Sequence, residues 1–178
     1  NSTTLHANGV YIYNSTVDVL NCIIAGNKQP NSASDGAGIH CHSCSLSLTN
    51  TLISNNEAGE FGGGLFVENA SNIEVEGCEI TGNMAGISGG GIFIDSSSTG
   101  NVTNTEIHNN DANFDGGGIY AENCLLEIEQ SSILDNHSSL SNPGHGGGLA
   151  VFHGAQISLS HCVLSLNSSV TGGGLYSY

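Results

Sequence analysis

The sequence predicts one right-handed parallel β-helix of about six coils, an all-β solenoid with three short strands in each coil of about 27 residues. Two repeated signatures and an alternating apolar pattern predict this fold class. In the first signature, small residues, mostly three glycines, precede an aliphatic residue, and these aliphatic residues are spaced 29, 26, 27, 27, 30 and 26 positions apart. The copies are Asn8-Gly9-Val10, Gly36-Ala37-Gly38-Ile39, Gly62-Gly63-Gly64-Leu65, Gly89-Gly90-Gly91-Ile92, Gly116-Gly117-Gly118-Ile119, Gly146-Gly147-Gly148-Leu149 and Gly172-Gly173-Gly174-Leu175.

In the second signature, an aliphatic residue stands three positions before an asparagine once in each period. We expect these asparagines to form an inward ladder in which each amide bonds to the turn of the next coil. Such a ladder satisfies backbone groups that a buried corner would leave unpaired. Its members are Asn27, Asn56, Asn83, Asn110, Asn136 and Asn167.

The third observation is strict alternation between the two signatures, as in Ile73-Glu74-Val75-Glu76, which is typical of a half-buried strand. No segment has a helical period. Coils stacked at the interstrand spacing give a rod on the order of 30 Å long, and parallel crossovers favour the right-handed form. We expect residues 1–178 to be a single β-helix domain, either a segment of a longer chain or a unit of an end-to-end assembly.

The charge balance limits the partners. Sixteen acidic residues face a single basic one, Lys28, which gives a formal net charge of −15. Nucleic acid is excluded as a partner because phosphate binding needs many Lys and Arg side chains. We also expect no membrane insertion by this chain, since no apolar stretch approaches the length of a span.

One outward face of the β-helix holds most of the aromatic residues. Side chains alternate along a strand, so the residue after each aliphatic residue of the first signature should point to solvent. This aromatic stripe consists of Tyr11, His40, Phe66, Phe93, Tyr120 and Tyr176. Exposed aromatic residues usually mark a partner, so the stripe could stack on glycans, pack against another copy of the rod, or reinforce the sheet by cross-strand pairing.

Beside the stripe, Glu68, Asp95 and Glu122 should stack about 5 Å apart on neighbouring coils. Carboxylates this close either bind a cation, for which Ca²⁺ is the candidate, or raise one another's pKa. A solvated acidic stripe is the alternative. We predict no other cofactor.

Cys41 and Cys44 are the one pair that can form a local disulfide across a turn. Cys22, Cys78 and Cys162 share an inward column but lie on separated coils, so we expect buried free thiols. His40 and His42 flank Cys41, yet both should face outward while Cys41 faces inward. The run therefore does not gather four ligands around a zinc ion.

Six sequons for N-glycosylation are present. We expect Asn14, Asn69 and Asn101 to face outward and to be acceptors. Asn136 and Asn167 belong to the asparagine ladder and should be unmodified, and Asn1 remains undecided.

With these repeats, the chain resembles the polymorphic outer membrane protein repeats of chlamydiae and, more broadly, secreted right-handed β-helix proteins. The resemblance covers nearly the whole chain, with Gly-Gly-Gly-Ile/Leu where that family has Gly-Gly-Ala-Ile, and Ile-x-x-Asn where it has Phe-x-x-Asn. Members of that family are surface-exposed adhesins. The resemblance therefore implies an extracellular or cell-surface location and an adhesive role.

The competing class is the polysaccharide-active β-helix enzymes. The lyases and the polygalacturonases of this class each use a basic residue, and Lys28 is the only one in this chain. Glu68, Asp95 and Glu122 could still supply an acid and a nucleophile at the spacing of retaining glycosidases. We therefore predict a structural or adhesive solenoid that binds glycans or associates with itself, laterally or end to end in a filament, with a polysaccharide-binding protein, lyase or glycosidase as the alternative.

Overall fold

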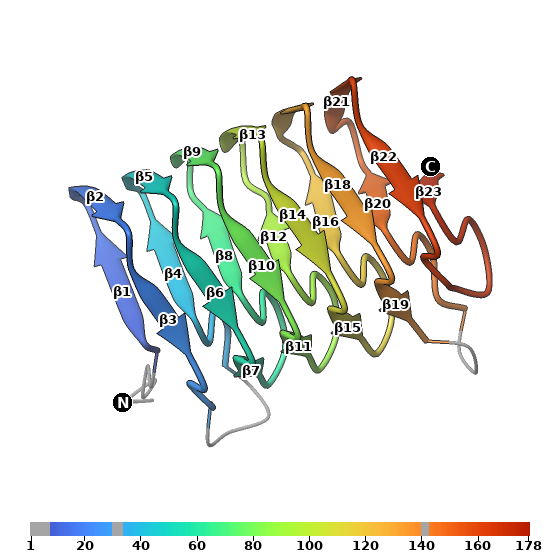
Figure 1. The fold of residues 1–178 in the computed structure, drawn as a ribbon, viewed down its shortest axis with the longest axis horizontal. Helices are drawn as coiled ribbons and strands as arrows, with labels where there is room; N and C mark the ends of the chain where they lie inside the picture. The colour runs from blue at the N-terminus through green and yellow to red at the C-terminus, as the bar shows by residue number, and fades with distance from the viewer. Residues whose placement is uncertain (1–7, 30–33, 140–142) are drawn as a thin grey trace.

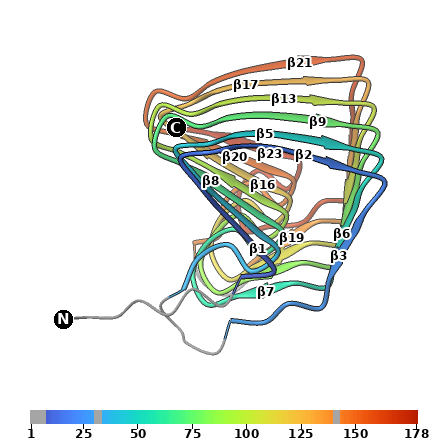
Figure 2. The ribbon, with the colours of Figure 1, turned by 90° about the vertical axis from the view of Figure 1, so that its left-hand side faces the viewer.

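The computed structural model describes residues 8–29, 34–139 and 143–178, which form a parallel β-helix (Figure 1). The chain winds through its coils from one end of the solenoid to the other, and equivalent strands of successive coils lie side by side (Figure 2). Every strand pair is parallel. No helix occurs in these three ranges, so none of the described residues forms a helix able to cross a membrane.

Three long sheets run along the solenoid. Sheet A has seven strands: β1 (Val10–Tyr13), β4 (Ile39–His42), β8 (Leu65–Glu68), β12 (Ile92–Ile94), β16 (Ile119–Glu122), β20 (Leu149–Phe152) and β23 (Leu175–Ser177). Sheet B has six: β2 (Thr16–Leu20), β5 (Ser45–Thr49), β9 (Asn72–Glu76), β13 (Thr99–Thr103), β17 (Leu125–Glu129) and β21 (Gln156–Ser160). Sheet C also has six: β3 (Ile23–Ala25), β6 (Leu52–Ser54), β10 (Glu79–Thr81), β14 (Glu106–His108), β18 (Ser132–Leu134) and β22 (Val163–Ser165).

A short fourth sheet, sheet D, corrects the prediction of three strands in each coil. Its two-residue strands follow the ladder asparagines, where the sequence predicted a plain turn. The coil-to-coil hydrogen bonding continues through this corner, as in Met84 N–H to Asn56 O at 2.8 Å. The strands are β7 (Glu57–Ala58), β11 (Met84–Ala85), β15 (Asp111–Ala112) and β19 (His137–Ser138).

The core is the apolar interior of the coils. Inward residues of sheet A pair in register, as Ile94 does with Val67 and Ala121. Six equivalent inward residues of this sheet are all buried at 0–7% exposure: Ile12, Cys41, Val67, Ile94, Ala121 and Val151. Because inward residues pack on those of the neighbouring coils, the apolar columns form one continuous core.

The asparagine ladder is confirmed. In every ladder asparagine after Asn27, Oδ1 accepts hydrogen bonds from the backbone N–H and from Nδ2 of the asparagine in the preceding coil, at 2.9–3.1 Å. Nδ2 also donates to the carbonyl of the preceding coil, for example from Asn83 to Ile53 at 3.0 Å. The side-chain oxygen and nitrogen of these buried asparagines are thus both hydrogen-bonded. The exposure is only 0–1% in Asn56, Asn83, Asn110 and Asn136.

The glycine signature packs directly against this ladder. A Cβ on Gly91 would lie 2.5 Å from the carbonyl oxygen of Gly118 and 3.1 Å from Nδ2 of Asn110. The repeat therefore requires glycine because two backbone segments and an amide meet there.

A second polar ladder stands at the corner between sheets B and C. The backbone N–H of Cys22 donates to Thr51 Oγ1 at 3.3 Å, and the N–H of Cys78 donates to Thr105 Oγ1 at 3.2 Å. Cys78 is buried as expected, whereas Cys22 is exposed and Cys162 is only partly buried. The prediction fails for these two because Cys22 and Cys162 lie on the first and last described rungs, which have a neighbouring coil on one side only.

Candidate functional site

The outer face of sheet A carries a continuous series of ring contacts. Neighbouring rings along the stripe lie 4.7–5.2 Å apart from Tyr11 through His40, Phe66 and Phe93 to Tyr120. The series then moves to Phe152 and ends at Tyr176, with centroid distances of 5.4 and 5.5 Å. The rings therefore link all seven strands of the sheet.

The expectation that this stripe faces water is wrong for its centre. His40, Phe66 and Phe93 are only 4–6% exposed. The turn before each strand folds back over the first outward residue, so that a Cβ on Gly62 would lie 2.6 Å from Cβ of Phe66. Gly62 has a φ of +64°, and this left-handed conformation aims the backbone across the face. Phe61, which precedes it, adds a ring 4.8 Å from Phe93.

The three stacked carboxylates each have a different partner. Glu68 contacts His40 and His42. Asp95 Oδ1 accepts the N–H of Ser96 in its own turn, and Glu122 accepts the hydroxyl of Tyr120 at 2.8 Å. The structure therefore does not gather Glu68, Asp95 and Glu122 around one cation.

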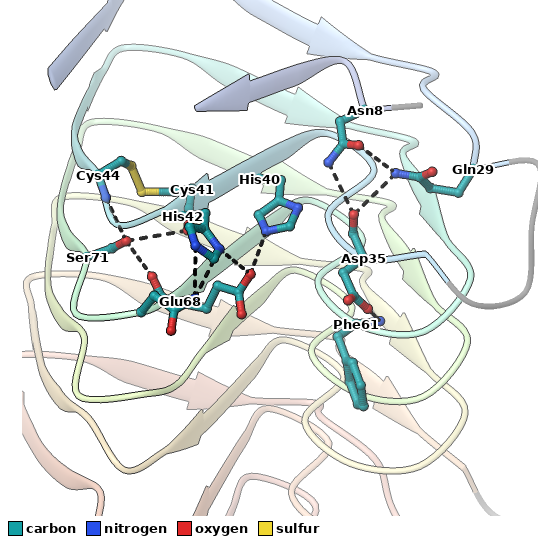
Figure 3. A network of polar contacts seen from close by, with 11 residues as sticks. Asn8, Gln29, Asp35, His40, Cys41, His42, Cys44, Phe61, Glu68 and Ser71 are labelled. Atoms are coloured by element: carbon teal, nitrogen blue, oxygen red, sulfur yellow. Dashed lines mark hydrogen bonds and ion pairs between the residues drawn. A yellow bond between two sulfur atoms is a disulfide. The ribbon is translucent and has the colours of Figure 1, made fainter. Parts of the chain in front are cut away.

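A different group gathers on strands β4 and β8 (Figure 3). His40 and His42 are alternate residues of β4, so both rings point outward, and Glu68 is the residue of β8 paired with His42. Oε1 of Glu68 lies 3.0 Å from Nε2 of His40 and 2.8 Å from Nδ1 of His42. Within the described ranges, these are the three His, Cys, Asp or Glu residues whose ligand atoms all lie within 4.8 Å of one another.

Burial and hydrogen bonds shift the pKa of Glu68 and of the nearby Asp35 in opposite directions. The hydrogen bond from His40 lowers the pKa of Glu68, with His42 acting in the same direction against partial burial. Burial raises the pKa of Asp35, which lies nearby and accepts the N–H of Phe61 at 3.3 Å (Figure 3). Glu68 is thus held as a carboxylate, while Asp35 is disfavoured as one.

A disulfide joins Cys41 and Cys44, with their Cα atoms 5.6 Å apart. It forms the local bridge that the spacing allowed. Cys41 faces the core between the two outward histidines, so its sulfur does not join them.

The corresponding position near the other end of sheet A is built differently. Glu122 contacts a single histidine, His153, with Nδ1 to Oε1 at 2.7 Å. The His153 side chain is 62% exposed, against 5% for His40. Burial and the hydrogen bond to Glu122 raise the pKa of Tyr120, which stays a neutral donor.

A hollow of about 340 Å³ lies at the corner between sheets A and B, beside the Glu122 and His153 pair. It is lined by Ser97, Ser98, Thr99, Asn123, Cys124, Leu125 and Gly154. Its one ionisable side chain is Cys124, whose thiol pKa burial raises to about 12. A thiol with this pKa is a poor nucleophile.

The family model described as right handed beta helix region matches residues 1–164. The chain belongs to the right-handed β-helix family. This confirms the predicted fold class, including its hand, while the finer resemblance to the chlamydial repeats stays a prediction. No curated protein and no solved structure matches the chain.

The outer surface of this β-helix places the three expected glycan acceptors in water. Asn14, Asn69 and Asn101 are exposed, whereas Asn136 is buried in the asparagine ladder. Asn167 is partly buried, and Asn1 lies outside the described residues.

Sequence reasoning on this β-helix missed how its histidines are used. Within the described residues, six histidines contact a carboxylate, in each case across adjacent coils. These pairs are His40 and His42 with Glu68, His108 with Glu79, His137 with Asp111, His145 with Asp115 and His153 with Glu122. The signal was available in the repeat alignment, because each histidine and its acid stand about one period apart.

Proposed function

We propose that this β-helix is a structural and adhesive segment of an extracellular protein, without a catalytic role. The observation that carries the proposal is the continuous ring series on the outer face of sheet A. It uses the side chains of this face for coil-to-coil cohesion, and rings at its centre are buried. Stacked aromatic pairs stabilise a sheet by roughly 0.5–1.5 kcal/mol each beyond their burial.

The acidic residues of the same face support this assignment. A retaining glycosidase needs two carboxyl groups that face one substrate-sized space. Glu68, Asp95 and Glu122 instead bond to different neighbours. The single basic residue, Lys28, pairs with Glu57 of sheet D and not with an acid of sheet A.

Two features support the extracellular location. A disulfide such as Cys41–Cys44 persists in oxidising compartments. Sequons at exposed turns or strands, as at Asn14, Asn69 and Asn101, are accessible for glycosylation in the secretory pathway.

The test is to examine the purified chain by electron microscopy and to assay it on neutral and acidic polysaccharides. We expect rods or fibres and no new reducing ends or unsaturated products. Fibres would add end-to-end stacking to the structural role. Product release that disappears in Glu68→Gln or Glu122→Gln would contradict the proposal and assign a glycosidase or lyase.

Adhesion is tested separately on glycan arrays and on immobilised copies of the chain. Tyr13 and Tyr178 are the most exposed tyrosines described on this face, at 55% and 83% exposure. We expect Tyr13→Ser and Tyr178→Ser to weaken binding. Leu20→Ser removes an apolar side chain of similar exposure, 59%, outside sheet A, and should leave binding unchanged. Equal loss in all three variants would exclude this face as the adhesive surface.

A further inference from the structure

The cluster of His40, His42 and Glu68 has the composition and shape of a metal site. Its donors are two imidazole nitrogens and a carboxylate oxygen from two adjacent strands. In a tetrahedral zinc site, ligand atoms at about 2.0–2.1 Å from the ion lie about 3.3 Å from one another. Glu68 Oε1 already lies 3.0 and 2.8 Å from the two ring nitrogens, and all three ligand atoms lie within 4.8 Å of one another, so rotations of the three side chains can bring them around one ion.

We propose that His40, His42 and Glu68 bind a divalent transition-metal ion of the Zn²⁺ type on the outer face of sheet A. Two imidazoles and one carboxylate are a donor set that suits zinc and its neighbours. Ca²⁺ requires six to eight oxygen ligands, which this cluster does not offer. The ion would tie strand β4 to strand β8 and keep a fourth position for water or for a donor from a partner.

The surroundings hold the three ligands in place. The ring of His40 lies edge-on between Tyr11 and Phe66, with centroids 5.0 and 4.8 Å away. Tyr13 stacks on His42 at 5.2 Å. The Cys41–Cys44 disulfide anchors the backbone next to both histidines. Ligands that are fixed before binding lose little conformational entropy when the ion arrives.

The cluster is only partly buried, so a metal ion can reach it from solvent. The His40 side chain is 5% exposed, but those of His42 and Glu68 are 27% and 26% exposed. An ion can therefore enter past His42 and Glu68, and its open position would face the surface. His40 at the back would raise affinity by shielding the ion from water on one side.

The same face provides a matched control. Glu122 occupies the same column as Glu68, and His153 contacts it from the next coil. This second site has one histidine, and its other near neighbour is the hydroxyl of Tyr120. If two histidines and a carboxylate together make the site, the Glu122 region should bind zinc far more weakly.

The test is calorimetric titration of the full chain, purified without a polyhistidine tag and freed of metal, with ZnCl₂ and separately with CaCl₂. We expect one zinc ion per chain, no heat from calcium, and a rise in melting temperature with zinc. Glu68→Gln and His42→Asn should weaken zinc binding at least about tenfold, while Glu122→Gln and His153→Asn should leave it unchanged. The absorption spectrum of the Co²⁺-loaded chain should show low-coordinate bands that Glu68→Gln abolishes.

Three results would overturn the proposal: no zinc binding by the unaltered chain, equal binding by the Glu68→Gln and unaltered chains, or equal weakening in Glu122→Gln. Circular dichroism of each variant shows that it folds. His42 and Glu68 are chosen for substitution because they are partly exposed, whereas replacing the buried His40 risks the packing of its neighbours.

Discussion

The inner corners of the coils and the outer face of sheet A follow opposite rules. At the corners, the same residues recur in coil after coil: glycine before sheet A and asparagine before sheet D. On the outer face, equivalent positions hold tyrosine, histidine, phenylalanine or alanine in one column and tyrosine, histidine, glutamate, aspartate or phenylalanine in the other. A corner residue meets the same backbone above and below, which restricts it to a few small or amide side chains. An outward residue has solvent or a variable neighbour beside it, so chemistry specific to one coil is built there.

The largest expected effect comes from replacing a buried corner asparagine, Asn83. Asn83→Ala would remove, in a buried site, the hydrogen bonds that Asn83 accepts from the N–H and Nδ2 of Asn56 and the one that it donates to the carbonyl of Ile53. We expect a loss of about 4 kcal/mol in the free energy of unfolding, measured by urea denaturation. Asn167→Ala removes the half-buried last rung, where water can replace the lost bonds, and should cost less than about half as much. Equal losses would contradict the role of burial in the asparagine ladder.

Gly91→Ala tests the requirement for glycine at the corners before sheet A. The added methyl group would meet the carbonyl oxygen of Gly118 at 2.5 Å, which forces two coils apart. We expect a loss of about 3 kcal/mol. Gly174 has the same place in the repeat and nothing within 4 Å of an added Cβ, so thermal unfolding of Gly174→Ala should match that of the unaltered chain. A tolerated Gly91→Ala would show that the coils can adjust.

Phe93→Ala probes the outer face where it is buried. Phe93 lies between Phe66 and Tyr120 and under Phe61, with ring centroids 4.7–5.2 Å away. We expect a loss of roughly 2–3 kcal/mol, somewhat below that of a phenylalanine in a full core. Tyr13→Ala, at an exposed position of the same sheet, should cost less than about 1 kcal/mol. Differential scanning calorimetry of both variants checks whether the buried ring series supports the fold.

The smallest effect concerns Asp35 and depends on pH. Because its folded-state pKa is raised, the stability linked to its protonated form is complete below the ordinary value of 3.8 and is lost as pH rises through the folded value. Asp35→Asn keeps an acceptor for the N–H of Phe61 and removes the buried charge, so we expect a gain on the order of 0.5 kcal/mol at pH 7 that disappears below the ordinary value.

Glu68→Gln, measured with a chelator present, should have the opposite sign. Its lowered pKa stabilises the fold above the ordinary glutamate value, and this contribution is lost as pH falls through the folded value. Glu68→Gln should therefore be less stable than the unaltered chain at pH 7, with the difference shrinking in acid. A common sign for the two variants would contradict the opposite environments of these acids.

The corners were predictable because the same residue types recur at the same positions of each repeat. The spacing of Ile107 and Asn110, and of the same pair in other coils, predicted a ladder that the structure confirms. For the outer face, the sequence predicted which side chains point away from the core but not which of them are buried. Phe66 and Phe93 do point away from the core, but no sequence pattern indicated that the glycine turn lies over them.

The parallel β-helix, its register and the residues that fill its interior follow from the period and alternation of the residues along the chain. Which outward side chains are buried, and which of them meet, depends on how the turns and neighbouring coils are arranged in space. Glu68 turns to His40 and His42 instead of stacking with Asp95 and Glu122, because the hydrogen bonds and partial charges of neighbouring imidazoles attract a carboxylate that like charges repel.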